Sequence, residues 1–498
     1  MILFCISLFF PLLSFIVAGI FSHSSKNLFI GLLCSLLMIV SATASLMLTA
    51  SLSVDEPLNL TLKEFINLGS LDLSFSFYLD AISLVMLSTV GVVASIVHIY
   101  SIGYMRDDAS FNRFFSYLGL FVFCMNVLVS SDNFIGLFIG WEGVGLCSWL
   151  LIGFWYKRPS ANVAANEAFV MNRVADLAML VGIFYIFYSF GSLKFSEVFN
   201  ARSDLSGLNL GVIATLLFIG AMGKSAQFPF HTWLPLTYTQ APFLGSMFLA
   251  AMMSKMGIYG FLRFCLPMFS AASAYFANFI CVLALIMIIY ASFIAFKKTN
   301  AKEIIAYSSA AHMSVIVLGV FSFNQIGLSG AVFMMLSHAL ISGGLFIGVG
   351  FLERKSANLD IFKFGSLSRK MPLFALFFAV MMLGLIGLPL TAGFVGEFLC
   401  LAGIYALNPW FALVGGCGII MSAIYALRMF SAMFSGESST LQISDIRGGE
   451  ILALAPIVVL IIVLGVAPNL VLEQINESTQ NLVEMMKFND EALAKEAR

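Results

Sequence analysis

Long apolar segments, separated by short polar ones, fill most of this chain of 498 residues. A helix that spans a membrane needs about 20 mostly apolar residues, and about fourteen segments meet that requirement. Their approximate limits are 2–21, 28–51, 78–101, 112–131, 133–155, 168–190, 208–232, 243–266, 270–296, 303–321, 324–351, 373–403, 408–434 and 450–472. The stretch from Glu473 to Arg498 is acidic and amphipathic, and we expect it to lie outside the bilayer. The pattern predicts an all-α, polytopic membrane protein.

The first apolar segment begins at Ile2 with no basic region before it, and no clear cleavage site of small residues follows it. A secretory signal peptide would have both features. We therefore expect this segment to be retained as the first span.

Composition agrees with the predicted spans. Hydrophobic residues make up 60% of the chain and charged residues 10%, whereas soluble domains average about 45–50% and about 25%. These values exclude a cytosolic enzyme, a secreted disulfide scaffold, a disordered chain and a nucleic-acid-binding protein. The formal net charge is −1, so the positions of the few charges are more informative than their sum.

The eight cysteines lie in or beside apolar runs and form no CxxC pair, which is typical of small packing residues. The sequence also has no GxGxxG motif after a strand, no Walker loop and no HExxH motif. We expect no cofactor or metal on this chain, so any redox or nucleotide chemistry would belong to another chain.

Lysine and arginine residues concentrate in alternate loops. One set of loops holds most of them, including Lys297, Lys298 and Lys302. The opposite set, without the C-terminal tail, holds only Lys63, Lys194, Arg202 and Arg263. Because basic loops stay in the cytoplasm, this distribution predicts that both termini face the periplasm or its equivalent.

Two of the predicted spans are interrupted by helix-breaking residues. The seventh contains KSAQFPFHTWLP, with Lys224 and Pro229, and the twelfth contains LIGLPLTAGFVGEF, with Gly387, Pro389 and Gly393. Irregular backbone at membrane depth is tolerated where it is buried in protein or lines a wet cavity. A pair of broken helices, one in each half, is typical of transporters with internal repeats and an ion site at the membrane midplane.

The spacing of the two breaks supports two five-helix units, spans four to eight and nine to thirteen. We therefore divide the chain into residues 1–107 (three N-terminal helices), 108–267 (first repeat), 268–435 (second repeat) and 436–498 (last helix and tail). Direct sequence similarity between the two units is weak.

Ionisable residues lie near the middle of several predicted spans. Such a side chain costs about 2.5–3.5 kcal/mol at a helix centre even on permissive scales, so we expect these residues to face one another or water. In chain order they form a series of acid, base, base, histidine, histidine and acid, as a relay of protonatable groups requires. The six candidates are Glu142, Lys224, Lys255, His312, His338 and Glu397.

Structural alternatives remain open for each candidate. Lys224 beside Glu142 could be a paired structural charge, and the two histidines could be packing residues. Arg173 and Asp176, three residues apart in NRVAD, are expected to form an orienting ion pair. His231, in HTWLP, could cap the cytoplasmic entrance or anchor its helix. His98 and Asp80, near opposite ends of the third span, are expected at the membrane interfaces.

Several sequence blocks resemble the antiporter-like membrane subunits of respiratory complex I, the proton-pumping NADH:quinone oxidoreductase. The blocks HIYSIGYM, FIGWEGVGLCSWLLIGFW and NRVAD resemble subunit L. From about residue 240 the chain resembles subunit M, and its length agrees with that of subunit M. The blocks that resemble subunit M are FLAAMMSKMGIYGFLRF, IIAYSSAAHMSVIVLG, LSHALISGGLFIGVGFLERK and IGLPLTAGFVGEFLCLAGIY. The resemblance covers roughly residues 75–470.

The resemblance implies a fourteen-helix antiporter-like fold with two inverted five-helix repeats and two discontinuous helices. It implies proton-transfer roles for the six central residues, with no redox centre on this chain. FMN, iron–sulfur clusters and quinone are implied on partner subunits, which would be other membrane and peripheral subunits of the complex. It also implies the bacterial inner (plasma) membrane as the location.

Some positions depart from the family pattern. Leu236 stands where HTWLPD has an acid, Glu303 where an arginine is usual before the YSS motif, and Glu167 where L-type chains often have lysine. These changes affect loop electrostatics more than the central series. The alternatives are a subunit of an Mrp-type cation/proton antiporter or of a membrane-bound hydrogenase, and a non-catalytic scaffold. Buried charges argue against a scaffold, because apolar replacements would stabilise it.

Overall fold

The computed structural model describes residues 1–22, 27–51, 57–68, 71–201, 207–268, 270–436 and 443–496. Arg202, one of the few basic residues of the opposite loops, lies outside these residues. Within them, eleven helices are long and apolar enough to cross a membrane. They are α1 (Ile2–Ile20), α2 (Leu28–Ser51), α3 (Ala81–Tyr104), α4 (Phe111–Ser130), α5 (Phe134–Ile152), α6 (Pro159–Phe190), α13 (Ser270–Lys297), α14 (Ala301–Val320), α15 (Gln325–Ser356), α19 (Pro409–Phe434) and α20 (Gly449–Val466).

Three further segments correspond to the seventh, eighth and twelfth predicted spans, and each is irregular. The seventh consists of α8 (Gly207–Lys224) and α9 (Trp233–Gln240), and the twelfth of α17 (Pro372–Ile386) and α18 (Ala392–Leu407). The eighth is a continuous helix with two π-helical stretches: α10 (Phe243–Phe248), η2 (Leu249–Met253), α11 (Ser254–Gly260), η3 (Phe261–Cys265) and α12 (Leu266–Met268). The helical membrane fold predicted from the sequence is confirmed, and both predicted breaks lie where proline and glycine interrupt the apolar run.

The backbone at each break takes a conformation that a regular helix does not allow. After α8, Ala226 has a φ of 51°. After α17, Gly387 has a φ of 73° and Leu390 a φ of 71°. Glycine adopts the left-handed region without steric cost, which explains why the second break begins at Gly387.

The same local arrangement occurs twice in the chain. Asn133 caps α5 and forms an antiparallel bridge with Lys194, which follows α6. Asn300 caps α14 and forms an antiparallel bridge with Asp360, which follows α15. A short helix comes next in each case, α7 (Phe195–Asn200) or η4 (Ile361–Lys363). The broken helix follows α7 directly, and it follows η4 after one further short helix, α16 (Leu367–Lys370). This recurrence supports the predicted repeats, whose boundaries at residues 107, 267 and 435 stay a prediction.

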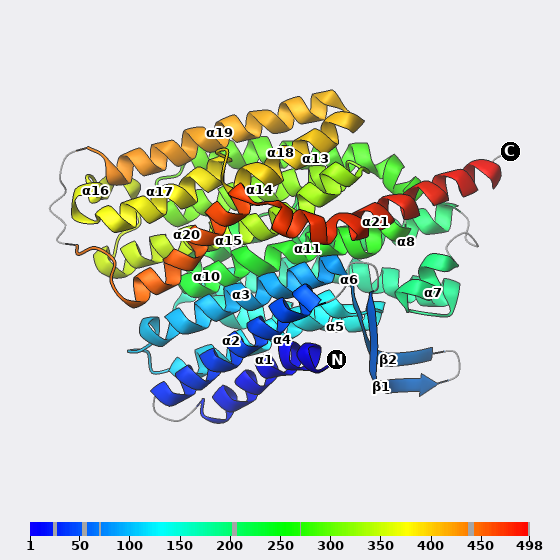
Figure 1. The fold of residues 1–498 in the computed structure, drawn as a ribbon, viewed down its shortest axis with the longest axis horizontal. Helices are drawn as coiled ribbons and strands as arrows, with labels where there is room; N and C mark the ends of the chain where they lie inside the picture. Colours follow the sequence, from blue (N-terminus) through cyan, green and yellow to red (C-terminus); the bar gives the residue numbers. More distant parts are fainter. Residues whose placement is uncertain are drawn as a thin grey trace.

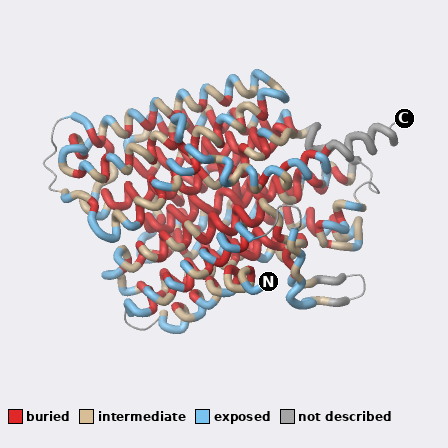
Figure 2. The backbone as a smooth tube through the Cα atoms, viewed as in Figure 1, coloured by how far each residue is buried: buried red, intermediate tan, exposed pale blue. Residues whose placement is uncertain are grey.

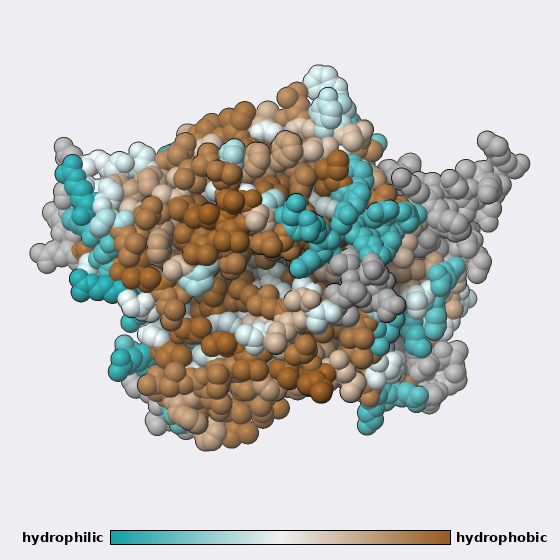
Figure 3. Space-filling model, in the orientation of Figure 1, coloured by the Kyte–Doolittle hydropathy of each residue, from teal (hydrophilic) through white to brown (hydrophobic). Residues whose placement is uncertain are grey.

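The two ends of the molecule differ. A β-hairpin that the sequence analysis did not predict, β1 (Leu58–Leu68) and β2 (Leu71–Leu79), lies at one end with α7. The short helix α16 (Leu367–Lys370), which carries basic residues, lies at the opposite end (Figure 1). Hydrophilic residues gather toward these two ends, and a hydrophobic zone lies between them (Figure 3). The long axis of the bundle therefore runs across the membrane.

The C-terminal helix α21 (Asn469–Glu496) does not cross the bundle with the other helices. It runs over the front of the bundle after α20, toward the end that holds the hairpin (Figure 1). Its Asn476 and Thr479 side chains bond to Gln325 and Ser329 at the start of α15. The amphipathic tail expected from the sequence is therefore a helix that packs on this surface.

Buried residues fill the interior of the bundle (Figure 2), and close helix contacts there depend on glycine. A Cβ atom on Gly257 of α11 would lie 2.2 Å from the Ala221 carbonyl oxygen and 2.6 Å from the Ser225 nitrogen. Both atoms belong to the backbone at the end of α8. This contact brings the helix that carries Lys255 against the helix that ends at Lys224.

Gly257→Ala should destabilise the protein, because neither backbone atom can move without shifting α8. Overpacking of this kind costs about 1–3 kcal/mol. The measurement is the thermal midpoint of the detergent-solubilised protein, which we expect to fall. Gly211→Ala in α8 is the matched control, since nothing lies within 4 Å of its added Cβ. Equal midpoints for the two variants would contradict the close contact.

Candidate functional site

Two ion pairs connect α5, α6 and the first broken helix. The Lys224 ammonium at the end of α8 lies 3.1 Å from Asp176 Oδ2 on α6, and both side chains are buried. Trp141 Nε1 on α5 donates to the other carboxylate oxygen of Asp176 at 2.6 Å. On the same two helices, Glu142 forms an ion pair with Arg173.

This pairing corrects the one expected from the sequence. We expected Lys224 beside Glu142 and an ion pair between Arg173 and Asp176, but each acid pairs with the base of the other pair. The reason is the orientation of α6. Asp176 faces the interior, whereas the Arg173 side chain is 46% exposed on the surface and reaches Glu142 from outside.

Glu142 nevertheless stays close to Lys224. A Cβ atom on Gly145 would lie 3.0 Å from Lys224 Nζ and 3.8 Å from Glu142 Oε2. The absence of a side chain at Gly145 leaves room for the ammonium group between the two acids. Lys224 is thus held by Asp176 with Glu142 as a near neighbour.

Lys255 and His338 form the second contact of the series. Lys255 Nζ on α11 lies 2.7 Å from His338 Nδ1 on α15 and also donates to the Ala250 carbonyl oxygen. The lysine is 1% exposed and the histidine 3%. The π-helical stretch η2 ends two residues before Lys255, and such stretches frequently occur at functional sites.

His312 and Glu397 form the third contact, at the second broken helix. His312 Nδ1 on α14 lies 2.8 Å from Glu397 Oε1 on α18. The carboxylate fits only because Gly387 has no side chain, since a Cβ there would lie 2.2 Å from Glu397 Oε2. The break in the helix therefore makes the space that the buried acid occupies.

The second and third contacts meet at a small cavity. Its lining includes His312, His338, Glu397 and Ser337, and the two imidazole rings lie 5.8 Å apart. Both Nε2 atoms, and Glu397 Oε2, have no hydrogen-bond partner among the described residues. The cavity has room for about one water molecule, which needs two to four polar partners.

The six predicted central residues therefore lie along one series. Lys255–His338 and His312–Glu397 are direct contacts, and the two histidine rings lie 5.8 Å apart. Lys224 pairs with Asp176, has Glu142 as a near neighbour, and is separated from Lys255 by the contact of Gly257 with the end of α8.

Gln227, in the first break, was not selected from the sequence. Gln227 Oε1 in the first break accepts from Ser314 Oγ on α14 at 2.9 Å. The available signal for Gln227 in the sequence was an amide side chain within the interrupted span, two residues before Pro229.

His231 lies outside this chain of contacts. Its ring stacks on Phe228 at 5.6 Å and meets Tyr290 edge-on at 5.1 Å. This aromatic packing supports the anchoring alternative over the role of an entrance cap.

These features define a class of protein: a multi-pass integral membrane protein with buried acids, lysines and histidines at two broken helices. A family model described as "NADH:quinone oxidoreductase/Mrp antiporter, TM" matches residues 131–422. A second, described as "NADH-Ubiquinone oxidoreductase (complex I), chain 5 N-terminus", matches residues 65–115. The chain belongs to this family of complex I antiporter-like membrane subunits.

Curated relatives carry the names of two different subunits. NADH-quinone oxidoreductase subunit L of Campylobacter jejuni is 41% identical over 92% of this chain and 76% of its own length. Subunit M of Rickettsia prowazekii is 32% identical over 97% of this chain and 98% of its own length. The similarity to both subunits that the sequence blocks predicted is confirmed.

A solved structure shares the fold. A chain of respiratory complex I from Thermus thermophilus with bound NADH superposes with a TM-score of 0.86 and 21% sequence identity. The match covers 96% of this chain and 99% of that one.

Asp176→Asn should destabilise the protein more than Glu142→Gln, because it leaves a fully buried ammonium without its ion-pair partner. Removing one member of a buried pair costs about 3–5 kcal/mol. The double variant Asp176→Asn/Lys224→Met should recover most of the loss in thermal midpoint. If Lys224→Met recovered the thermal midpoint of Glu142→Gln but not that of Asp176→Asn, the pairing described above would be incorrect.

Proposed function

We propose that this chain is a proton-translocating membrane subunit of an NADH:quinone oxidoreductase. Family membership supports the assignment to complex I, and the chain of buried contacts from Glu142 to Glu397 supports proton transfer. The observation that carries the proposal is the placement of ionisable groups inside apolar helices, where each is costly unless it is used or paired.

In this proposal Lys224 is the group that is loaded and unloaded. Its ammonium is stabilised by Asp176 at 3.1 Å and by the nearby Glu142 carboxylate. A change that draws Glu142 toward Arg173, or away from it, alters the negative charge that Lys224 experiences. Because the lysine is fully buried, loss of that charge favours release of its proton toward Lys255.

The second half of the series can pass a proton without moving a helix. The Lys255 ammonium donates to His338 Nδ1, so His338 carries its own proton on Nε2. With Glu397 ionised, His312 donates from Nδ1 and can accept on Nε2. A water in the small cavity would join the two Nε2 atoms.

Proton transfer through this unit is balanced at every atom. Lys255 gives a proton to His338 Nδ1, and His338 gives its Nε2 proton to the water. The water gives a proton to His312 Nε2, and His312 gives its Nδ1 proton to Glu397 Oε1. Lys255 ends neutral and Glu397 ends protonated, while both histidines return to a neutral form.

The redox reaction of NADH and quinone belongs, in this proposal, to partner subunits that hold FMN and iron–sulfur clusters. The described residues contain no group of three or more His, Cys, Asp or Glu side chains suited to a metal ion. The chain acts as part of a translocating enzyme by converting changes in its partners into proton movement.

The orientation follows from the basic loops. The end that holds α16 would face the cytoplasm of a bacterial inner membrane, and the end that holds β1–β2 and α7 the periplasm. Both termini would then be periplasmic.

An Mrp-type cation/proton antiporter is the second candidate, because the description of the matching family names it beside the oxidoreductase. A membrane-bound hydrogenase subunit would use the same buried groups. Sodium-dependent proton exchange, or hydrogenase-linked activity, without dependence on NADH would distinguish these candidates.

Purification of the tagged native protein in mild detergent tests the assembly. We expect flavin and iron–sulfur subunits to copurify, identified by mass spectrometry, together with inhibitor-sensitive NADH:quinone activity. Copurification with hydrogenase or antiporter subunits would contradict the assignment to complex I while leaving the proton path open.

Lys224→Met and Lys255→Met should each lower the number of protons moved per NADH oxidised several-fold, because each removes one carrier from the series. The measurement is dye-monitored acidification of vesicles that contain the assembled complex. Lys298→Met is the control, since that lysine is 38% exposed, lies between α13 and α14, and pairs with Glu303 in the first turn of α14. Proton movement at the wild-type ratio in Lys224→Met would rule out the role assigned to that residue.

A further inference from the structure

A large cavity lies at the end of the molecule that holds the hairpin, apart from the chain of contacts described above. Its volume is about 920 Å³, and residues of β1–β2, α7 and α21 line it. Charged side chains in the lining include Glu64, Asp132, Lys194 and Glu484. We call it the vestibule.

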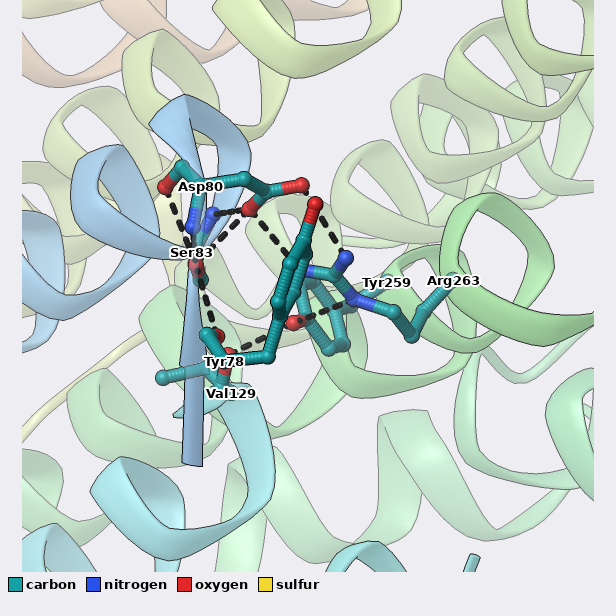
Figure 4. Close-up of polar contacts among 6 residues, drawn as sticks. All are labelled: Tyr78, Asp80, Ser83, Val129, Tyr259 and Arg263. Carbon is teal, nitrogen blue, oxygen red and sulfur yellow. Dashed lines mark hydrogen bonds and ion pairs between the residues drawn. The ribbon is translucent and has the colours of Figure 1, made fainter. Parts of the chain in front are cut away.

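The vestibule reaches a polar cluster between the spanning helices (Figure 4). Arg263 in η3 forms two hydrogen bonds with the Asp80 carboxylate, of 3.0 and 2.8 Å, and a third of 2.9 Å from Nε to the Tyr259 hydroxyl. The Tyr259 hydroxyl donates to the Val129 carbonyl oxygen at 2.6 Å. Asp80 also caps α3 through Ser83.

Asp80, expected from the sequence at a membrane interface, pairs in the structure with Arg263. The side chains of Asp80 and Arg263 retain 14% and 11% exposure. This ion pair therefore stands between the vestibule and the interior of the bundle.

One helix connects the cluster with the central series. Lys255, Tyr259 and Arg263 are spaced four residues apart, so they share one face of the helix. The rise of an α-helix puts Tyr259 about 6 Å along the axis from Lys255. The π-helical stretch η2 precedes this segment, and the π-helical stretch η3 contains Arg263.

We propose that the vestibule is the aqueous route through which Lys255 exchanges protons with the compartment at this end, and that Tyr259 and the Asp80–Arg263 pair control it. This inference rests on the proposed function and adds an access path to it. Tyr259 passes a proton by accepting one on its oxygen and releasing its hydroxyl proton to the next water. The tyrosine stays neutral.

The charge of Arg263 would form an electrostatic barrier in this path if nothing opposed it. A fixed arginine charge repels protons and other cations, as it does in selective channels. Asp80 neutralises that charge through its two hydrogen bonds. Loss of Asp80 leaves an unopposed cation in the path, whereas loss of both groups removes the barrier.

Tyr259→Phe in the assembled complex tests the inference, because it removes only a hydroxyl group. We expect protons moved per NADH oxidised to fall at least twofold in proteoliposomes. Tyr185→Phe is the control, since it also removes a hydrogen-bonded hydroxyl group but lies on α6 away from the vestibule lining. It loses one hydrogen bond, to Asn209, whereas Tyr259→Phe loses two, to Val129 and from Arg263. A wild-type ratio in Tyr259→Phe would overturn the role of that tyrosine.

A charge series tests the barrier. Asp80→Asn should lower the ratio more than Tyr259→Phe, and Asp80→Asn/Arg263→Gln should restore part of it. A double variant that moves no more protons per NADH than Asp80→Asn would contradict the barrier.

If Lys224→Met loses pumping while these variants keep it, the vestibule path fails and the proposed function stands. If Lys224→Met keeps pumping, the proposed function itself fails.

Thiol labelling keeps the inference testable should the charge variants fail to assemble. Ser196→Cys places an exposed thiol of α7 in the vestibule lining, and Asn200→Cys places one on the same helix outside it. A positively charged, membrane-impermeant thiol reagent should lower the proton ratio of the first variant only. Complete labelling of Ser196→Cys without any change would exclude the vestibule as the proton route.

Discussion

The cost of placing a charge where no water can solvate it governs this structure. Lys224 and Lys255 are almost completely buried, and an isolated ammonium group there would be neutralised or would unfold its helix. Asp176 on α6 and His338 on α15 meet that requirement in different ways. An acid holds Lys224 charged, whereas a neutral imidazole and a carbonyl oxygen leave the charge of Lys255 uncompensated. In the proposed function, this difference favours proton release from Lys224 toward Lys255 only when a charge beside Lys224 changes.

Glycine makes the ionisable groups fit. Gly145 leaves space for the Lys224 ammonium, Gly257 allows α11 to touch the end of α8, and Gly387 leaves space for Glu397. At Gly387 the positive φ and the steric requirement coincide. The second broken helix therefore serves two purposes, because its interruption at Gly387 ends an apolar run and also creates room for the Glu397 carboxylate.

In the proposed function, proton transfer along the membrane is separate from transfer across it. The ionisable groups from Glu142 to Glu397 lie on helices of both predicted repeats. In that proposal, access to either compartment needs a different path. The helix that carries Lys255 also carries Tyr259 and Arg263, and the vestibule begins where that helix ends.

The sequence by itself determined the spans and the two breaks, and it singled out the six ionisable residues near the middle of those spans. Hydrophobic length and helix-breaking residues are local properties, and a buried charge in an apolar run is visible without a structure. Only the tertiary structure decided which charge meets which, because the rotation of α6 places Asp176 inside and Arg173 outside. The same holds for Asp80 and Arg263, which are 183 residues apart and meet only through packing. The hairpin also escaped prediction, since its strands lie between two spans of much stronger pattern.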